Sequence, residues 1–354
     1  MLQFHPATIV EKHNETDDSV LLTLEVAAEF ADEYRYSQGQ HLPVRATIDG
    51  NELRRTYSIC SSVSDANLRL GIRIQGKVSG YLAEQLEVGD TLEVMPPTGH
   101  FQTPVDPQQQ KTYAAFVAGS GITPILSIAK TALETEPDSR FFIFYGNRKR
   151  SSTMFIEELC ALKNNYPERL ALHFIMSQEE NEIPLYSGRV DGVRVKLLHQ
   201  AFLAETRPDD IFVCGPNPMI DDVTDSLIEL GYDAERIHSE RFRPNQPDSV
   251  PAQPDRAPPP DGVRVTVVMD GNRQTFAMED AEQTLLDAAL DLDIDLPYSC
   301  MGGVCSTCRT KLVKGKVNME VNSALEDWEL EEGYVLTCQS RPESDEIELD
   351  YDQA

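Results

Sequence analysis

The sequence predicts a multidomain chain: an antiparallel β-barrel, then a doubly wound parallel α/β domain, then a small α+β domain of the β-grasp type. Residues 1–105 hold short segments rich in β-branched residues with turn residues between them, which is typical of a barrel. From Lys111 onward, apolar strand-like segments alternate with helical ones, as a parallel sheet requires. A proline-rich segment then separates the last part of the chain. We expect domains at 1–105, 106–243 and 263–354, with a linker at 244–262.

The barrel strands are expected at 7–10, 20–27, 41–48 and 68–74, where apolar or β-branched residues recur. Turn residues separate them, above all Asp49-Gly50-Asn51 and Gly89-Asp90. In the second domain we expect strands at 113–118, 140–145, 170–176 and 210–214, with helices from Pro124 and at 154–163 and 219–230.

In the last domain, a turn at Asp270-Gly271-Asn272 joins expected strands at 263–269 and 274–277. Further strands are expected at 310–313 and 346–350, with helices at 284–292 and 324–330. Residues 261–354 contain 21 acidic and 7 basic side chains, so this region carries −14 of the net charge of −28.

Bulk properties exclude several classes of function. A net charge of −28 over 354 residues is repelled by nucleic acid and by anionic membranes. No apolar run approaches the roughly 18 residues of a membrane span, and the first residues lack the features of a signal peptide. We therefore expect a cytoplasmic protein, in which thiols stay reduced and disulfides are rare.

Four of the seven cysteines follow the spacing C-x4-C-x2-C with a distant fourth member, the pattern of plant-type [2Fe–2S] ligation. Zinc ribbons favour two C-x2-C pairs, and the last cysteine here has no cysteine neighbour. Disulfides do not suit a reducing compartment. The expected iron ligands are Cys300, Cys305, Cys308 and Cys338, whereas Cys60 and Cys160 are expected to be structural.

The pattern R-x-Y-S at Arg55, Tyr57 and Ser58 predicts a flavin contact. The arginine fork suits a phosphate, and the tyrosine two residues on points the same way from a strand. Further on, the turn Gly76-Lys-Val-Ser79 opens a helix, where free N–H groups and a hydroxyl favour an anion. Together they predict a dinucleotide flavin whose pyrophosphate is shared by Arg55 and Ser79; an ordinary barrel surface is the alternative.

The turn from Gly119 to Pro124 lies between a strand and a helix, where open α/β sheets bind ligands. Glycines let a phosphate approach the backbone, Thr123 can cap the helix, and Pro124 suits its first turn. The turn lacks a Walker lysine, which argues against a kinase. The residues expected to hold a nucleotide pyrophosphate are Gly119, Ser120, Gly121, Thr123 and Pro124.

The loop after the next strand contains Arg148, Lys149, Arg150, Ser151 and Ser152, with no acidic residue. An acidic residue would hold the ribose hydroxyls of NADH, whereas arginine accommodates a 2′-phosphate. Arg148 and Ser151 are therefore expected to select NADPH, with NADH possible; a solvated basic loop is the alternative.

Two further motifs lie near the end of the second domain, one after its last expected strand and one that closes the domain. Cys214-Gly215-Pro216 would place a small thiol beside a nicotinamide, although a buried cysteine is more often a core residue. In Ser239-Glu240-Arg241-Phe242, Glu240 would lie near the reactive edge of a flavin and Phe242 would cover its face, or pack as a core residue.

The motifs R-x-Y-S, G-x-x-S, G-S-G-I-T-P and C-G-P occur in this order ahead of the cysteine loop. This arrangement resembles the ferredoxin–NADP reductase superfamily fused to a plant-type ferredoxin, and within it the reductase components of oxygenases. The resemblance implies a barrel that binds FAD, a domain that binds a nicotinamide nucleotide, and a separate di-iron oxygenase as electron acceptor. It implies catalytic roles for Ser58, Cys214 and Glu240, and FAD contacts that also include Ile72, Arg73, Lys77 and Val78.

Reductases of ring or steroid hydroxylases, or of a hybrid-cluster protein, remain alternatives. A redox sensor without turnover is another, and the intact G-S-G-I-T-P and C-G-P turns argue against it. The appended cysteine domain argues against a reductase that only releases reduced flavin.

Overall fold

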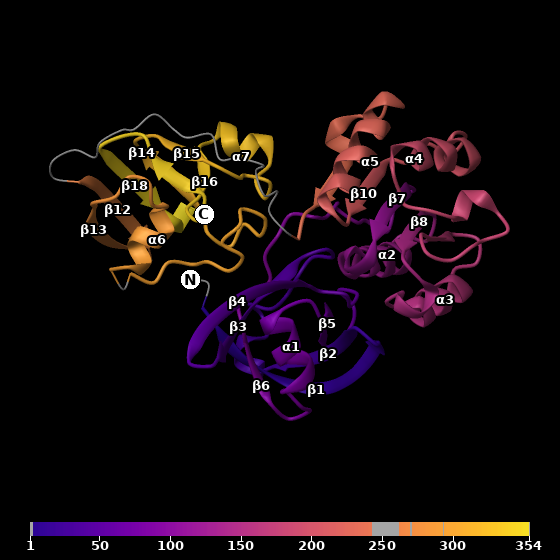
Figure 1. Cartoon of the computed structure of the whole chain (residues 1–354), viewed down its shortest axis with the longest axis horizontal. Helices are drawn as coiled ribbons and strands as arrows, with labels where there is room; N and C mark the ends of the chain where they lie inside the picture. Colours follow the sequence, from indigo (N-terminus) through magenta and orange to yellow (C-terminus); the bar gives the residue numbers. More distant parts are fainter. Residues whose placement is uncertain (1–2, 243–261, 270, 293, 354) are drawn as a thin grey trace. The chain divides into compact units, whose positions relative to one another are not determined.

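The structure, a computed structural model, describes residues 3–242, 262–269, 271–292 and 294–353 (Figure 1). These residues form two compact units: the larger contains Phe4–Leu53 and Tyr57–Arg241, and the smaller contains the C-terminal residues from Phe242 on together with Gln3 and Arg54–Thr56. All but the last residue of the predicted linker, and Asp270 of the predicted turn, lie outside the described residues, and the domain boundaries stay predictions. None of the helices in the described segments combines the length and apolarity needed to cross a membrane.

The first sheet of the larger unit has six strands in the order β4-β3-β6-β1-β2-β5. A bridge between Ile59, next to β4, and Leu70 of β5 joins the two edges of this sheet, so it closes into the predicted barrel. Helix α1 buries Val78 and Leu82 in the barrel interior. The elements are β1 (His5–Thr16), β2 (Ser19–Val26), β3 (His41–Ile48), β4 (Asn51–Ser58), β5 (Leu68–Arg73), α1 (Lys77–Glu84) and β6 (Thr91–Val94).

Strand β4, which ends at Ser58 as expected for the strand that holds Arg55 and Tyr57, begins after a tight turn. Asp49 and Gly50 have φ angles of 53° and 78°, the left-handed conformation that two-residue hairpin turns need. Along β1, the buried residues His5, Ala7 and Ile9 alternate with exposed ones, so one face of the strand forms the barrel core.

The second sheet of the larger unit is the predicted doubly wound one, with strand order β11-β10-β7-β8-β9 and parallel pairing. The order reverses at β7, which lies between β10 and β8, so the switch point where such sheets bind ligands is the carboxyl end of β7 and β10. Its strands are β7 (Thr112–Ala118), β8 (Arg140–Asn147), β9 (Leu170–Met176), β10 (Asp210–Cys214) and β11 (Ile237–Glu240).

Helices cover both faces of this sheet (Figure 1). Tyr113, Ala115 and Val117 of β7 share one apolar cluster with α2 and α3, whereas Ala114 and Phe116 share another with α4 and α5. This alternation is the two-residue period of a strand buried on both faces. The helices are α2 (Ile122–Thr135), α3 (Ile156–Asn165), α4 (Gly192–Leu198), which continues into a π-helical turn at His199–Leu203, and α5 (Asn217–Glu229).

The C-terminal unit is the predicted β-grasp domain, a mixed sheet of order β13-β12-β18-β14-β16 with helix α6 packed on it. Strands β12 and β18 pair in parallel, and the other described pairs are antiparallel. Thr284 caps α6 by accepting the N–H of Asp287 at 3.1 Å. The elements are β12 (Val263–Met269), β13 (Asn272–Met278), α6 (Leu285–Leu290), β14 (Arg309–Lys314), β15 (Val317–Met319), α7 (Asp327–Glu331), β16 (Tyr334–Leu336), β17 (Ser340–Pro342) and β18 (Glu346–Asp350).

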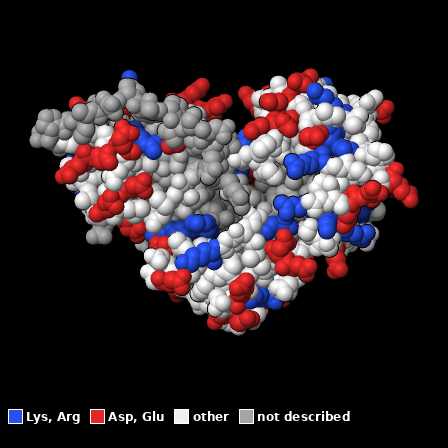
Figure 2. Space-filling model, viewed as in Figure 1, with Lys and Arg blue, Asp and Glu red and all other residues white. Residues whose placement is uncertain are grey.

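Carboxylates are spread over the visible surface of this C-terminal domain, with few lysines or arginines among them (Figure 2). Short 3-10 turns complete the described structure. They lie at Ala28–Phe30, Gly119–Gly121, Arg150–Ser152, Pro184–Tyr186, Ala234–Arg236 and Tyr351–Gln353.

Candidate functional site

The carboxyl end of β7 runs directly into a glycine turn that opens helix α2. Gly119 has φ of 57°, a left-handed conformation that costs glycine little. A Cβ on Gly121 would lie 2.4 Å from the carbonyl oxygen of Cys214, so only glycine fits there. The turn after β7 therefore packs against the end of β10, at the switch point of the sheet.

The remaining residues of the two turns reinforce this contact. A Cβ on Gly215, which is followed by Pro216, would approach the Cβ of Ala118 to 3.3 Å. The expectation that Thr123 caps α2 is wrong: its hydroxyl donates to the carbonyl of Ser120 at 2.9 Å, and no side chain caps this helix. Pro124 lies in the first turn of α2, as expected. The N–H groups at the start of α2, with the helix dipole, favour an anion here.

Three predicted catalytic residues lie together beside this turn. Cys214 and Glu240 are opposite each other in the β10–β11 pairing. The hydroxyl of Ser58, at the end of β4, donates to Oε2 of Glu240 at 3.4 Å. All three side chains are buried. A thiol, a hydroxyl and a carboxyl group thus meet where the barrel contacts the parallel sheet.

A fourth member of this group, His41, belongs to none of the sequence motifs. Its Nδ1 lies 3.3 Å from Oε1 of Glu240. A signal was present: the hairpin turn at Asp49-Gly50 has His41 and Ser58 at equal distances along the chain on either side, so antiparallel pairing places them opposite each other. The hydrogen bond from the N–H of Ile59 to the carbonyl of Gln40 agrees with this register.

Burial raises the pKa of the Cys214 thiol well above its usual value, and the charge of Glu240 adds to the effect. The sulfur is therefore a neutral, polarisable group at neutral pH. It suits packing against a ring better than nucleophilic attack.

The predicted flavin contacts on the barrel occupy two elements. Arg55 and Tyr57 share one face of β4, because side chains alternate along a strand. Arg55 is exposed and donates to the carbonyl of Arg54 at 2.6 Å, and Tyr57 is half-buried. Ile72 is fully buried in the barrel core, so only its backbone is available to a ligand.

The turn before α1 differs in detail from the expectation. The hydroxyl of Ser79 accepts the N–H groups of Gln75 at 2.9 Å and Gly76 at 3.0 Å, so it shapes the turn and is not free for an anion. Val78 is buried, and Lys77 pairs with Asp49 at 2.8 Å. A cavity of about 430 Å³ opens beside this turn. It is lined by Thr47, Ile48, Asp49, Gly76, Lys77, Gly80, Tyr81, Glu84 and Gln85.

Arg73 connects the barrel to the glycine turn. A Cβ on Gly119 would lie 3.6 Å from its Nη1, while its Nη2 donates to the carbonyl of Ser152 at 2.8 Å. Its Nε is buried and has no hydrogen-bond partner among the described residues. Nη2 also pairs with Asp18 at 3.3 Å, whereas Nη1 faces Gly119, so a cation beside the helix start fits the binding of a phosphate.

The basic loop after β8 is exposed at Arg148, Lys149, Arg150 and Ser151. The hydroxyl of Tyr145, at the end of β8, donates to the carbonyl of Gly119 at 2.9 Å, so the loop and the glycine turn are linked. The predicted nucleotide contacts therefore lie at the carboxyl ends of neighbouring strands.

The loop does have an acidic neighbour, which corrects the premise that no acid lies near it. Oε1 of Glu179 accepts the N–H of Arg150 at 3.1 Å. Strands β8 and β9 are parallel, so the residues after β9 lie beside those after β8; the N–H of Gln178 donates to the carbonyl of Arg148 at 2.9 Å. Glu179 is far from this loop in the sequence and comes near it only through the pairing of β8 with β9. The sequence of the loop therefore did not predict this carboxylate.

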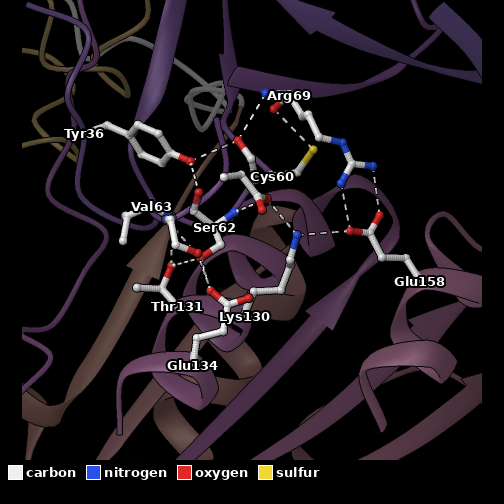
Figure 3. A network of polar contacts seen from close by, with 12 residues as sticks. Tyr36, Cys60, Ser62, Val63, Arg69, Lys130, Thr131, Glu134 and Glu158 are labelled. Atoms are coloured by element: carbon white, nitrogen blue, oxygen red, sulfur yellow. Dashed lines mark hydrogen bonds and ion pairs between the residues drawn. The ribbon is translucent and has the colours of Figure 1, made fainter. Parts of the chain in front are cut away.

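A network of polar contacts joins the barrel to the nucleotide-type domain (Figure 3). Arg69 of β5 forms two hydrogen bonds with Glu158 of α3, and Lys130 of α2 contacts both Asp65 at 2.8 Å and Glu158 at 3.4 Å. Glu134 of α2 accepts the hydroxyl of Ser64 at 2.8 Å. This network fixes the barrel against α2 and α3, and so fixes the distance between Ser58 and the glycine turn.

The cysteine loop of the C-terminal unit has the shape of a ligand cradle. Met301, Gly303 and Ser306 have positive φ angles of 52°, 72° and 51°, which wrap the backbone around the sulfurs. The N–H of Gly302 donates to Sγ of Cys300 at 3.3 Å. These contacts suit thiolates, which accept N–H groups when they bind iron.

The four cysteines are unoxidised and associate in pairs. Cys300 lies within hydrogen-bonding reach of Cys305, and Cys308 within reach of Cys338. The proximity of these partners and burial raise the pKa of Cys300 and of Cys308, and a bound cation would favour their thiolate forms. Among the described residues, no group of three or more His, Cys, Asp or Glu side chains is arranged to hold a single metal ion. Two pairs suit a binuclear centre in which each iron takes two thiolates.

Two other predictions have simpler outcomes. Phe242 is 40% exposed and belongs to the C-terminal unit, so its place over a flavin stays a prediction. Cys60 is buried, whereas Cys160 is exposed on α3, so core packing does not account for Cys160.

Three family descriptions match successive parts of the chain. Residues 6–103 match an oxidoreductase FAD-binding domain, 116–225 an oxidoreductase NAD-binding domain, and 267–343 a 2Fe-2S iron–sulfur cluster binding domain. These matches identify FAD, a nicotinamide nucleotide and a [2Fe–2S] cluster as the cofactors.

Several proteins are similar to this chain along most of its length. The chain is 42% identical to a component of 1,2-phenylacetyl-CoA epoxidase from Escherichia coli, over 99% of each chain. It is 34% identical to the ferredoxin reductase component of 3-ketosteroid-9-alpha-monooxygenase from Rhodococcus rhodochrous, over 95% of this chain and 94% of the relative. The solved structure of phthalate dioxygenase reductase has the same fold, with a TM-score of 0.59 and 22% identity over 98% of each chain.

Proposed function

Because the chain belongs to the family of FAD- and nicotinamide-dependent reductase components of oxygenases that carry a 2Fe-2S domain, we propose that it supplies electrons from NADPH to a di-iron phenylacetyl-CoA epoxidase. The observation that carries this choice of acceptor is the likeness to a component of such an epoxidase along nearly the whole of both chains. The protein would then act in the aerobic catabolism of phenylacetate, in the cytoplasm, where an acceptor of this kind works on a CoA thioester.

The positions of the candidate residues suggest which cofactor each of them would contact. When bound, the nicotinamide supplies a hydride, and the flavin and the cluster turn that electron pair into single electrons. Arg55, Tyr57, Ser58 and the turn Gly76–Ser79 would hold FAD, with Lys77, Val78 and the backbone of Ile72 as further contacts. Arg73, beside Gly119, would neutralise phosphate charge.

The nucleotide would bind across the switch point. Gly119, Ser120, Gly121, Thr123 and Pro124 would receive its pyrophosphate at the start of α2, where the glycines leave room for it. Cys214, Gly215 and Pro216 would border the nicotinamide ring. The neutral thiol of Cys214 would pack against the ring without reacting with it.

The preference for NADPH rests on the loop after β8. Arg148 and Ser151 are exposed there and would contact the 2′-phosphate. Glu179 opposes this preference, because its carboxylate lies in the same region. One of its oxygens already accepts the N–H of Arg150, and three basic side chains lie in the loop, so we propose NADPH as the better substrate and NADH as a slower one.

A second candidate acceptor is a steroid monooxygenase, since reductase components named for that function also match nearly the whole chain. The higher identity to the epoxidase component favours the epoxidase.

The test measures oxygen-dependent epoxidation of phenylacetyl-CoA by a purified epoxidase with this protein and NADPH. The proposal predicts turnover that needs this protein, the epoxidase and the nucleotide together. A steroid 9α-monooxygenase assayed in parallel separates the two acceptors. If the protein reduces ferricyanide but supports no epoxidation, it is a reductase whose acceptor is not this epoxidase.

A further inference from the structure

Glu15, on a strand of the barrel, caps a helix of the parallel-sheet domain. The N–H of Phe155, the residue before α3, donates to Oε1 of Glu15 at 2.7 Å, although the two residues are 140 positions apart. Phenylalanine has no side-chain acceptor, so Glu15 takes the part that the glutamate of a capping box plays within a helix. Its negative charge also suits the helix dipole. The other oxygen, Oε2, lies 3.9 Å from Nε2 of the exposed His13.

An irregularity in β1 directs Glu15 toward this helix. Asn14 pairs with Val20 and Thr16 pairs with Ser19, so the pairing with β2 skips Glu15. An extra residue of this kind is a β-bulge, which bends a strand and changes the direction of a side chain. The Glu15 side chain is 17% exposed, so it lies mostly against the protein and not in solvent. The bulge thus gives the barrel an acceptor for a helix of the other domain.

Phe155 needs support from its surroundings. Its φ of 59° is the left-handed conformation, which is uncommon for a bulky residue and persists only when neighbouring groups hold it. Its ring is fully buried, and a Cβ on Gly71 of β5 would lie 2.5 Å from its Cζ. Glycine at this place in the barrel therefore leaves room for the ring. The barrel holds both the backbone N–H of Phe155, through Glu15, and its side chain.

The loop of residues 148–155, which joins β8 to α3, is held at both of its ends. At its start, the N–H of Gln178 donates to the carbonyl of Arg148 at 2.9 Å. Near its end, Nη2 of Arg73 donates to the carbonyl of Ser152 at 2.8 Å, and the carboxylate cap lies three residues further on. The contacts near the end both come from the barrel. The position of this basic loop therefore depends on the domain that binds the flavin.

We propose that Glu15 is a positioning residue for the nucleotide: by capping Phe155, it holds the loop where Arg148 and Ser151 contact the 2′-phosphate. The inference rests on the proposed function, which assigns that contact. Glu15 acts through the loop and not on the ligand itself. A loop that is already ordered loses less conformational entropy when the phosphate binds, so Glu15 increases affinity. NADH has no 2′-phosphate and gains little from this order.

A purely structural role makes a different prediction. If Glu15 only stabilises the contact between the two domains, Glu15→Ala lowers the melting temperature and leaves nucleotide binding unchanged. Glu15→Gln is the conservative variant, because its amide oxygen can accept the same N–H. The matched control is Asp17→Asn, since Asp17 is exposed two residues further along the same hairpin.

The first experiment measures amide hydrogen exchange by mass spectrometry in the full chain with flavin and cluster bound and without nucleotide. In Glu15→Ala, peptides that cover residues 148–158 should exchange at least about threefold faster than in the wild type. Glu15→Gln and Asp17→Asn should exchange as the wild type does. Unchanged exchange in Glu15→Ala would show that Glu15 does not hold the loop, and would overturn the proposal. This measurement does not depend on turnover.

The second experiment measures binding of adenosine 2′,5′-bisphosphate by calorimetry, and the kinetics of ferricyanide reduction. Glu15→Ala should weaken binding of the bisphosphate and raise KM for NADPH, each about 3- to 30-fold. Its kcat with NADPH and its KM for NADH should stay within about twofold of the wild type, and Glu15→Gln should restore KM for NADPH. Equal changes in KM for NADPH and NADH, or no change in either, would overturn the proposal.

The two levels of inference fail separately. A wild-type protein with the same KM for NADPH and NADH would overturn the proposed preference for NADPH, and this result is read from the wild type alone. A wild type that prefers NADPH, with a Glu15→Ala variant that prefers it equally, would overturn only the role of Glu15. If Glu15→Ala does not fold, Glu15→Asp replaces it with the same expectations, because its carboxylate is one methylene group shorter.

Discussion

Arg69 and Glu158 form a two-pronged ion pair that joins the barrel to the parallel-sheet domain. Nη1 and Nη2 of Arg69 lie 2.8 Å and 3.0 Å from Oε1 and Oε2 of Glu158 (Figure 3). Lys130 contacts the same carboxylate and Asp65. Although burial opposes ionisation, the hydrogen bonds from Lys130 and from the N–H of Ser62 hold the pKa of Asp65 below its usual value. The geometry between flavin and nucleotide therefore depends on a small set of charges.

Glu158→Gln should lower the free energy of unfolding by about 1–2 kcal/mol, because the pair is half-buried and two-pronged. Glu157→Gln is the matched control, since Glu157 is exposed and directly precedes it on α3. Thermal unfolding of both variants measures the difference. Equal melting temperatures for the two would mean that the pair adds nothing to stability.

Gly121→Ala should destabilise the protein by about 1–3 kcal/mol and weaken nucleotide binding, since the new methyl group meets the backbone carbonyl of Cys214. Gly80→Ala provides the control: no atom lies within 4 Å of its added Cβ, and it lies inside α1, so alanine should stabilise by about 0.5–1 kcal/mol. Unfolding curves and titration with NADP⁺ follow both effects. Normal NADP⁺ binding by Gly121→Ala would contradict the proposed turn.

Arg148→Ala should raise KM for NADPH about 10- to 100-fold and change KM for NADH about twofold or less, because a lost hydrogen bond to a charged group costs about 1.5–3 kcal/mol. Arg140→Ala, at the other end of β8, should change neither. Glu179→Gln should act in the opposite direction and improve NADPH relative to NADH. Steady-state kinetics with both nucleotides measures these effects. If Arg148→Ala raises KM equally for NADPH and NADH, Arg148 does not recognise the 2′-phosphate.

Cys338→Ser should abolish the visible absorbance of the [2Fe–2S] cluster while flavin absorbance and ferricyanide reduction remain, since the barrel and the parallel sheet do not contain this ligand. Cys160→Ser should leave both spectra unchanged, because Cys160 is exposed on α3. A Cys338→Ser protein with a normal cluster spectrum would contradict the proposed ligands.

Reduction of a basic acceptor such as cytochrome c should slow as the salt concentration rises, because the C-terminal domain is acidic.

Asp210 provides a prediction about pH. Burial opposes its ionisation, but hydrogen bonds from His238 and Lys111 outweigh this and set the pKa of Asp210 well below its usual value. A carboxyl whose pKa falls on folding stabilises the protein above its unfolded pKa of about 3.9, and this contribution is lost as pH falls further. Asp210→Asn should therefore cost about 3 kcal/mol at pH 7, and the difference from wild type should shrink below about pH 4. Asp138→Asn, on an exposed turn, should follow the wild type at every pH.

Sequence periodicity predicted the architecture because most elements here are consistent with their local pattern. The strand at 41–48 and those at 170–176, 210–214, 263–269 and 346–350 have the predicted bounds. For β4 the motif predicted a strand that ends at Ser58 but not where it begins, because Asn-Glu-Leu-Arg-Arg-Thr-Tyr-Ser has too few apolar residues to show alternation. Strand β6 was missed because it has only four residues. Helix α4 was missed because it is one short amphipathic stretch that ends in a π turn.

Candidate site residues come from the sequence alone where one motif holds the whole signal, as in the cysteine loop and the glycine turn, and their roles stay predictions. His41, Glu179 and Arg69 were missed because each acts through a partner far away in sequence, at separations of 199, 29 and 89 residues. Such pairs are set by strand register and domain packing, which a local pattern does not contain. The hydroxyl of Ser79 shows the reverse case, in which the motif was present but its hydrogen bonds are made within the turn itself.

The pairing of Cys308 with Cys338 also has a consequence for biosynthesis. The proposed fourth ligand lies 30 residues after the third and follows the barrel and the parallel sheet along the chain, so four sulfurs could coordinate iron only after both of those domains have been synthesised. Once bound, the [2Fe–2S] cluster would link the residues just before β14 to the segment after β16 and so act as a cross-link within the C-terminal domain. The cluster domain, from which electrons leave, would therefore mature after the two domains that receive electrons from the nucleotide.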